Sequence, residues 1–224
     1  MSEVEAGQYE GLVVVVKEDC PTCTALEGVY AQLEGAGILA CYTQDNPAFP
    51  ASVSGPVHDT EFEHSYRLGI ETVPTLLRFV DGKEVGRAIG WHREERQALS
   101  GVNKLDEQLP ASQPGCGALN VQPGMPEMLA VRFGDIDLRA RRIEVSAMDD
   151  PHEACFERGW SDGLPVIPPT AVRVARMLSG TARDPQELLG EMPPDLAPCT
   201  VEKVAINAVM AGCKPEYLPV VIAA

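Results

Sequence analysis

The stretch VVVVKEDCPTCTALEGVYAQL, Val13–Leu33, passes from an apolar run into a helical pattern. Leu12 to Val16 is continuous, apolar and rich in β-branched residues, which predicts a strand buried on both faces. From Pro21 to about Glu34, apolar residues recur at helical spacing after a proline in the first turn, which predicts a helix. Cys20 and Cys23 therefore fall where this strand ends and the helix begins.

The elements that follow complete an α/β domain. A second strand over 38–43 makes a βαβ unit with a parallel pair. Residues 46–59 predict an inserted loop, and Thr60 to Leu68 predicts a short helix capped by Thr60 with Glu63 as its partner. Strands over 75–80 and 83–89 flank Asp81-Gly82, the sequence of a type I′ hairpin turn. A closing helix is expected from Arg93 to about Gln108, which gives the order β-α-β-α-β-β-α.

Residues 10–109 resemble the thioredoxin family. The resemblance rests on Cys20-Pro21-Thr22-Cys23 after the first core strand, Thr72-Val73-Pro74-Thr75 before the third, and the Asp81-Gly82 hairpin that ends at Gly90. It implies a thioredoxin-like domain over 1–109 that exchanges dithiols for disulfides.

The family also implies roles for individual residues. Cys20 is the expected nucleophile, and Cys23 the thiol that resolves the mixed disulfide. Pro74 is expected to be cis, to lie against the pair and to limit metal capture, and Val73 to offer its backbone to an extended substrate. We assign Pro21, Thr22, Val73 and Pro74 to substrate binding.

Physical chemistry supports a reactive sulfur at Cys20. The unpaired N–H groups and the dipole at a helix N-terminus favour a thiolate, which is the attacking species. Three departures from the family bear on this expectation. Asp19 stands where thioredoxins carry Trp, Glu18 and Asp19 bring negative charge that opposes the thiolate, and the buried acid of thioredoxins falls near Val14, which cannot transfer a proton.

Two other functions remain open at this point. The CxxC thiols could bind a soft metal or metalloid, with Cys116 as a third sulfur, although a zinc site needs more ligands than the pair supplies. The domain could also be a redox-inert adaptor. We assign no resident metal and no cofactor.

Pro- and Gly-rich residues 110–127 predict a linker between two domains. Cys116 within it could reach the Cys20–Cys23 pair as an accessory thiol or bridge to a partner. The alternative, which we favour from sequence, is an inert surface cysteine.

Residues 128–224 predict a second, mostly helical α+β domain, which we expect to be incomplete. We expect extended segments over 129–145 and helices capped by Thr170 and Thr200, and the Pro-rich loop beside Trp160 could line a pocket. This half resembles the N-terminal part of an uncharacterised bacterial family named for a UGSC motif. The resemblance rests on GWSDGLPVIPPT and TVEKVAINAVMAGCKPEYLPVV, and it implies a redox association. Cys199 and Cys213 are expected to be packed thiols, too far apart to bridge. The chain stops inside an apolar segment, so we expect a longer protein.

Composition limits the partners of this chain. Its 224 residues carry a net charge of −15, which disfavours nucleic acid and anionic membrane surfaces. No apolar run reaches the length of a membrane span, and the acidic N-terminus is not a secretory signal. We therefore expect a cytoplasmic protein that meets protein or small-molecule disulfides and a thiol-reducing system as electron donor.

Overall fold

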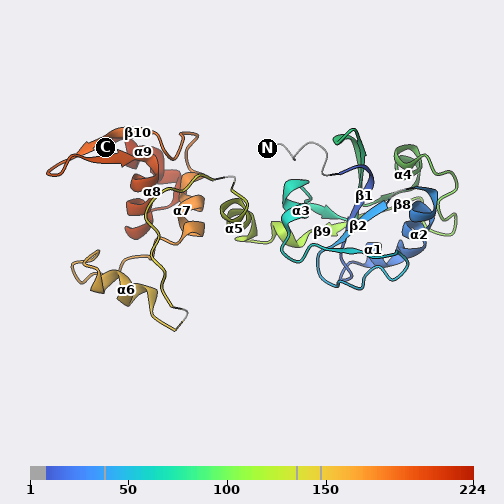
Figure 1. Cartoon of the computed structure of the whole chain (residues 1–224), viewed down its shortest axis with the longest axis horizontal. Coiled ribbons are helices and arrows are strands. Elements are labelled where there is room, and N and C mark those ends of the chain that lie inside the picture. Colours follow the sequence, from blue (N-terminus) through green and yellow to red (C-terminus); the bar gives the residue numbers. More distant parts are fainter. Residues whose placement is uncertain (1–8, 38, 135, 147) are drawn as a thin grey trace. The chain divides into compact units, whose positions relative to one another are not determined.

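The computed structural model describes residues 9–37, 39–134, 136–146 and 148–224. The chain forms two compact units, residues 1–129 and 130–224 (Figure 1). The first unit is a mixed α/β structure around a central sheet.

The central sheet of the first unit has the strand order β3-β2-β1-β5-β6. Neighbours β1 and β2, drawn in blue in Figure 1, run parallel, as do β2 and β3, whereas β5 is antiparallel to both β1 and β6. The strands are β1 Gly11–Val16, β2 Leu39–Thr43, β3 Val57–His58, β5 Thr75–Val80 and β6 Lys83–Ile89.

The first strand is buried as predicted, because its four valines are fully enclosed in the core. The predicted helix after it forms as two helices, α1 Pro21–Ala25 and α2 Glu27–Ala36, separated at Leu26. The hairpin between β5 and β6 is confirmed: Asp81 and Gly82 both have positive φ, as a type I′ turn requires. The expected second strand forms from Leu39, while its first expected residue, Ile38, lies outside the described residues.

Two helix predictions were wrong in detail. Helix α3, Glu63–Arg67, begins after Phe62, not at Thr60. The Asp59 carboxylate accepts hydrogen bonds from the N–H groups of His64 and Ser65, so it supplies the capping that the sequence assigned to Thr60. Helix α4, Arg93–Ser100, stops at Gly101 in a left-handed conformation, well before Gln108.

The segment predicted as a linker is folded onto the first unit. Two short antiparallel pairs hold it, and the compact units divide at Leu129, not at residue 109. The pairs join β4 Thr72–Val73 to β9 Cys116–Gly117, and β7 Trp91–His92 to β8 Ser112–Gln113. Backbone pairing of this segment with β4 and β7 therefore decides where it lies, although its composition predicts a linker. The segment continues into η1 Leu119–Val121 and α5 Met125–Arg132.

The second unit is built on two packed helices and a β-ribbon. Helices α7 and α8 pack together, and the side chains of Thr170 and Thr200 cap them as predicted. The extended segments expected over 129–145 form no strand among the described residues, since α5 covers their start. The elements are α6 Pro151–Glu157, α7 Ala171–Leu178, β10 Leu188–Met192, β11 Ala197–Thr200, α8 Val201–Met210, η2 Pro215–Tyr217 and α9 Leu218–Ala223.

A buried carboxylate organises the second unit. The Glu202 side chain accepts hydrogen bonds from the N–H groups of Arg139 and Ala140 and from the Gln186 amide. Glu202 is 3% exposed, so these bonds replace the water it gives up. The irregular segment before α6 is thereby fixed to the start of α8.

Candidate active site at the Cys20–Cys23 pair

Cys20 is the N-cap residue of helix α1 and follows strand β1 after a short turn. Its backbone is extended, and Pro21 occupies the first helical position, where the missing N–H costs nothing. The Asp45 carboxylate holds the preceding turn by accepting from the N–H groups of Glu18 and Asp19. Backbone contacts thus fix the direction in which the Cys20 side chain leaves the chain.

The Cys20 sulfur is strongly acidified. Its pKa falls from 9.0 to about 5, chiefly because the Cys23 thiol donates a hydrogen bond to it. Burial opposes the shift, and a hydrogen bond from the Cys116 thiol and the N–H groups of Cys23 and Thr22 add to it. The helix-start N–H groups that the sequence predicted do contribute, but a neighbouring thiol contributes more. The pKa of Cys20 is lowered although the acidic residues Glu18 and Asp19 precede it in the chain.

Cys23 has the opposite protonation. Burial is the largest cause that raises the pKa of its thiol, and the hydrogen bond to Cys20 adds to it. Cys23 is fully buried, and Cys20 is 1% exposed. The pKa values of the two thiols are therefore shifted in opposite directions.

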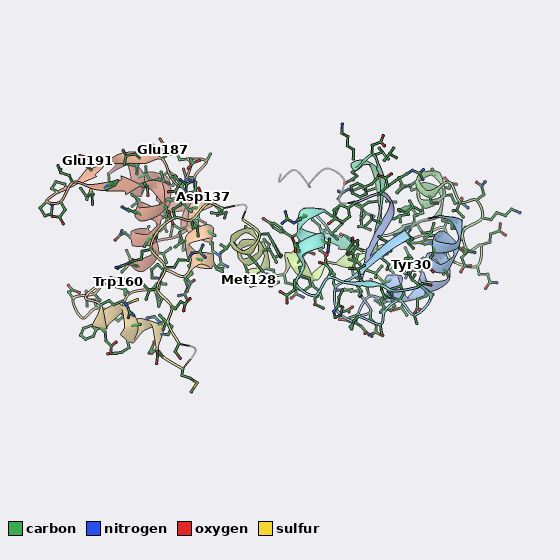
Figure 2. The ribbon with its side chains drawn as sticks, in the orientation of Figure 1. Tyr30, Met128, Asp137, Trp160, Glu187 and Glu191 are labelled. Carbon is green, nitrogen blue, oxygen red and sulfur yellow. The ribbon has the colours of Figure 1, made fainter. Side chains whose placement is uncertain are left out.

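A buried cation, Arg96 of α4, interacts electrostatically with Cys23. Val14, near which the thioredoxin resemblance leads us to expect a buried acid, is fully enclosed in the core. Arg96 of α4 is also fully buried, and its pKa, lowered by burial, is raised in part by the electrostatic pull of Tyr30 and Cys23. Among the described residues, Arg96 Nη1 and Tyr30 Oη have no hydrogen-bond partner. Figure 2 labels Tyr30 on α2, inside the first unit.

Arg96 also fixes the loop that carries Val73 and Pro74. Its guanidinium donates to the carbonyl of Gly90 at 2.6 Å and to that of Pro74 at 3.3 Å. The Gly90 N–H donates to the same Pro74 carbonyl at 2.8 Å. The Val73–Pro74 bond is cis, and the Val73 carbonyl oxygen lies 3.6 Å from Cys20 Sγ. The predicted substrate-binding residues Val73 and Pro74 thus lie at the cysteine pair.

The other two predicted substrate-binding residues differ in exposure. Pro21 is exposed, whereas Thr22 is buried. The Thr22 hydroxyl donates to the Pro114 carbonyl at 2.7 Å. Thr22 therefore holds the chain that precedes Cys116 instead of facing an open groove.

Cys116 is at the site, which the sequence analysis weighed and did not favour. It pairs with Val73 across the antiparallel pair β4–β9, and its thiol donates a hydrogen bond to Cys20. Sequence spacing gave no sign of this, because more than ninety residues separate the two cysteines. Arg96 was missed as well; a charged residue within the helix that closes the domain was the one available signal.

Metal binding has no matching ligand set in the parts of the chain that the structure describes. No group of three or more His, Cys, Asp or Glu is arranged there to hold an ion. His64, one of the two histidines near the pair in sequence, instead shares a hydrogen bond with the Tyr9 hydroxyl at 2.7 Å. All seven cysteines are free thiols, and burial raises the pKa of Cys41 to about 12.

The second unit contains a cavity of about 790 Å³, and the Pro-rich loop lines it as the sequence suggested. Trp160, labelled in Figure 2, Pro168 and Pro169 form part of the wall, together with Cys155 and Arg142. The thiols of Cys199 and Cys213 are half-buried on either side of α8.

Comparisons of the chain with protein-family models, curated proteins and solved structures gave no match. Among the described residues, no helix combines the length and the apolar character that crossing a bilayer requires. The function must therefore be argued from the site itself.

Proposed function

We propose that the first unit is a thioredoxin-like thiol–disulfide oxidoreductase, with Cys20 as the nucleophile and Cys23 as the resolving thiol. The observation that carries the proposal is the placement of Cys20 at the N-terminus of α1, with Cys23 one turn on and the Val73 carbonyl oxygen 3.6 Å from Cys20 Sγ. Thiol–disulfide exchange requires an attacking thiolate and a second thiol within reach. The order of the strands and the closeness of Val73-Pro74 to Cys20 support the family resemblance.

The first step is attack of the Cys20 thiolate on one sulfur of a substrate disulfide. The substrate S–S bond breaks, a Cys20–substrate disulfide forms, and the other substrate sulfur leaves as a thiolate. A pKa of about 5 leaves Cys20 almost wholly ionised at neutral pH. Attack therefore needs no separate base.

The second step belongs to Cys23. Once Cys20 is bound in a neutral disulfide, the negative charge that helped to keep Cys23 protonated is gone. The departing substrate thiolate can take the Cys23 proton, and the Cys23 thiolate then attacks Cys20 Sγ. The buried Arg96 cation favours that thiolate, because a nearby opposite charge stabilises the ionised form of a thiol. The products are a Cys20–Cys23 disulfide and a substrate reduced by two electrons.

The substrate class is a protein or small-molecule disulfide, and a thiol-reducing system returns the pair to the dithiol. Cys20 is 1% exposed, so substrate must enter as β9 separates from β4. We also propose that the second unit is a fused redox domain served by the Cys20–Cys23 pair, because two of its segments resemble the UGSC-motif family.

The test is catalysis of protein-disulfide reduction with dithiothreitol as electron source. Cys20→Ser is expected to abolish turnover above the uncatalysed rate, and Cys23→Ser to lose the Cys20–Cys23 disulfide that wild type forms when it reduces substrate. Cys199→Ser, which removes a half-buried thiol of the second unit, serves as the matched control and keeps full turnover. Undiminished turnover of Cys20→Ser refutes the assignment.

A further inference from the structure

The strand β9 places a third cysteine against the pair. Val73 lies next to both Cys116 and Cys20. It pairs with Cys116 across the antiparallel pair β4–β9, and its carbonyl oxygen lies 3.6 Å from Cys20 Sγ. An extended chain lined up along Val73, with a cysteine beside Cys20, is the position that a disulfide substrate must take in the proposed reaction. Here the chain fills that position with its own residue.

Specific contacts on both sides of Cys116 hold it there. The Lys17 ammonium donates to the Gly117 carbonyl at 3.0 Å, and the Ala118 N–H donates to the Glu71 carbonyl at 3.0 Å. On the other side, Thr22 holds the Pro114 carbonyl. Lys17 is largely buried, so its bond to Gly117 is sheltered from water.

Close backbone approach is a second, independent sign that this placement is built in. A Cβ on Gly115 would lie 2.6 Å from the Val73 carbonyl oxygen and would also collide with Thr72 Cγ2. Only glycine permits this approach, and it brings the backbone before Cys116 directly onto β4.

The exposure of the three thiols differs in a way that matters for chemistry. Cys23 is fully buried, whereas Cys116 is half-buried. An external thiol can therefore approach Cys116 Sγ more readily than Cys23 Sγ. The hydrogen bond that Cys116 donates to Cys20 raises the pKa of Cys116 and lowers that of Cys20.

We propose that Cys116 is a third redox thiol, which takes over the disulfide from Cys23 and presents it to a small-molecule thiol. Deprotonated Cys116 attacks Cys20 Sγ, the Cys20–Cys23 bond breaks, and a Cys20–Cys116 bond forms. Cys23 leaves as a thiolate and takes up the proton that Cys116 lost. The step is an exchange within the chain, so it consumes no oxidant and no reductant.

The external thiol then completes the reduction. It attacks Cys116 Sγ and Cys20 leaves as a thiolate, which is favourable because the leaving thiol with the lower pKa departs faster. A second molecule of the same thiol attacks the resulting mixed disulfide, which releases an oxidised thiol dimer and free Cys116. The donor class that fits is a small aliphatic thiol such as reduced glutathione.

The test maps disulfides in the full chain after oxidation. The reduced protein is treated with oxidised glutathione, free thiols are blocked with N-ethylmaleimide, and non-reduced peptides are identified by mass spectrometry. Because the inference rests on the proposed function, wild type and three variants are compared: Cys23→Ser, Cys116→Ser and the control Cys199→Ser. Reduction of each oxidised form by reduced glutathione is then timed.

We expect Cys23→Ser to form an internal Cys20–Cys116 disulfide, and wild type and Cys199→Ser to form both this bond and Cys20–Cys23. Cys116→Ser should form only Cys20–Cys23 and be reduced at least about tenfold more slowly, since the attacked sulfur is then buried. If Cys23→Ser leaves Cys116 unlinked while wild type forms Cys20–Cys23, the role of Cys116 is overturned and the proposed function stands. If wild type forms neither bond, the proposed function itself falls and this inference with it.

Discussion

Replacement of Gly115 by alanine should open the site to solvent. The new Cβ would lie 2.6 Å from the Val73 carbonyl oxygen, a distance that real Cβ atoms essentially never show. That oxygen belongs to the backbone of β4 and cannot rotate away, so β9 must move. Overpacking of this kind costs about 1–3 kcal/mol, and each 1.4 kcal/mol is about tenfold in an equilibrium. The open form should therefore rise about fivefold to a hundredfold.

The assay is the alkylation rate of Cys20 by iodoacetamide at neutral pH, read by mass spectrometry of its peptide. Cys20 is 1% exposed, so alkylation proceeds through the open form and its rate follows the opening equilibrium. Gly117→Ala is the matched control, because a Cβ there meets nothing within 4 Å and the residue lies in β9, two positions after Gly115. Equal rates for Gly115→Ala, Gly117→Ala and wild type would show that β9 does not cover Cys20.

Three further predictions concern charge and hydrogen bonding at the site. The thiolate absorbance of Cys20 should titrate near pH 5. Cys23→Ala should raise this midpoint by roughly 1–2 pH units, because a hydrogen bond to a charged group contributes about 1.5–3 kcal/mol. A larger rise in Cys116→Ala than in Cys23→Ala would contradict the conclusion that Cys23 lowers the pKa of Cys20 the most. Because the folded pKa of Cys20 lies below the unfolded value of 9.0, its stabilisation is complete above pH 9 and is lost as pH falls through about 5. Urea unfolding of reduced wild type, minus that of Cys20→Ser, should gain up to about 1.4 kcal/mol per pH unit in that window; a flat difference would refute the shift. Arg96→Met should lower the free energy of unfolding by about 1–3 kcal/mol, since it leaves the Gly90 carbonyl without its side-chain donor and the Pro74 carbonyl with the Gly90 N–H alone. An unchanged urea midpoint would exclude that role.

The sequence predicted those parts of the first unit that depend on local pattern. The valine run of β1, the Asp81-Gly82 turn and the placement of Cys20 at a helix start each follow from neighbours in the chain. The helix start at α3 was misplaced because the cap comes from Asp59, whose carboxylate reaches the N–H groups of two later residues. Such a contact depends on the loop that precedes it, which the sequence left undescribed.

The candidate site was predicted only in part, for a related reason. Cys20, Cys23 and Val73 are marked by short motifs, whereas Cys116 and Arg96 reach the pair through tertiary packing. The Pro- and Gly-rich composition of 110–127 predicted a linker, yet glycine is also what a close backbone approach requires, and at Gly115 the second meaning holds. Composition alone does not separate the two.

Because β9 and β4 belong to one chain, their encounter does not weaken when the protein is diluted. A tethered segment acts at an effective concentration on the order of millimolar or above. A free peptide that aligns along Val73 must therefore displace β9 first. Its apparent dissociation constant rises with the effective concentration of β9. This competition selects for partners that bring their own affinity from elsewhere on their surface.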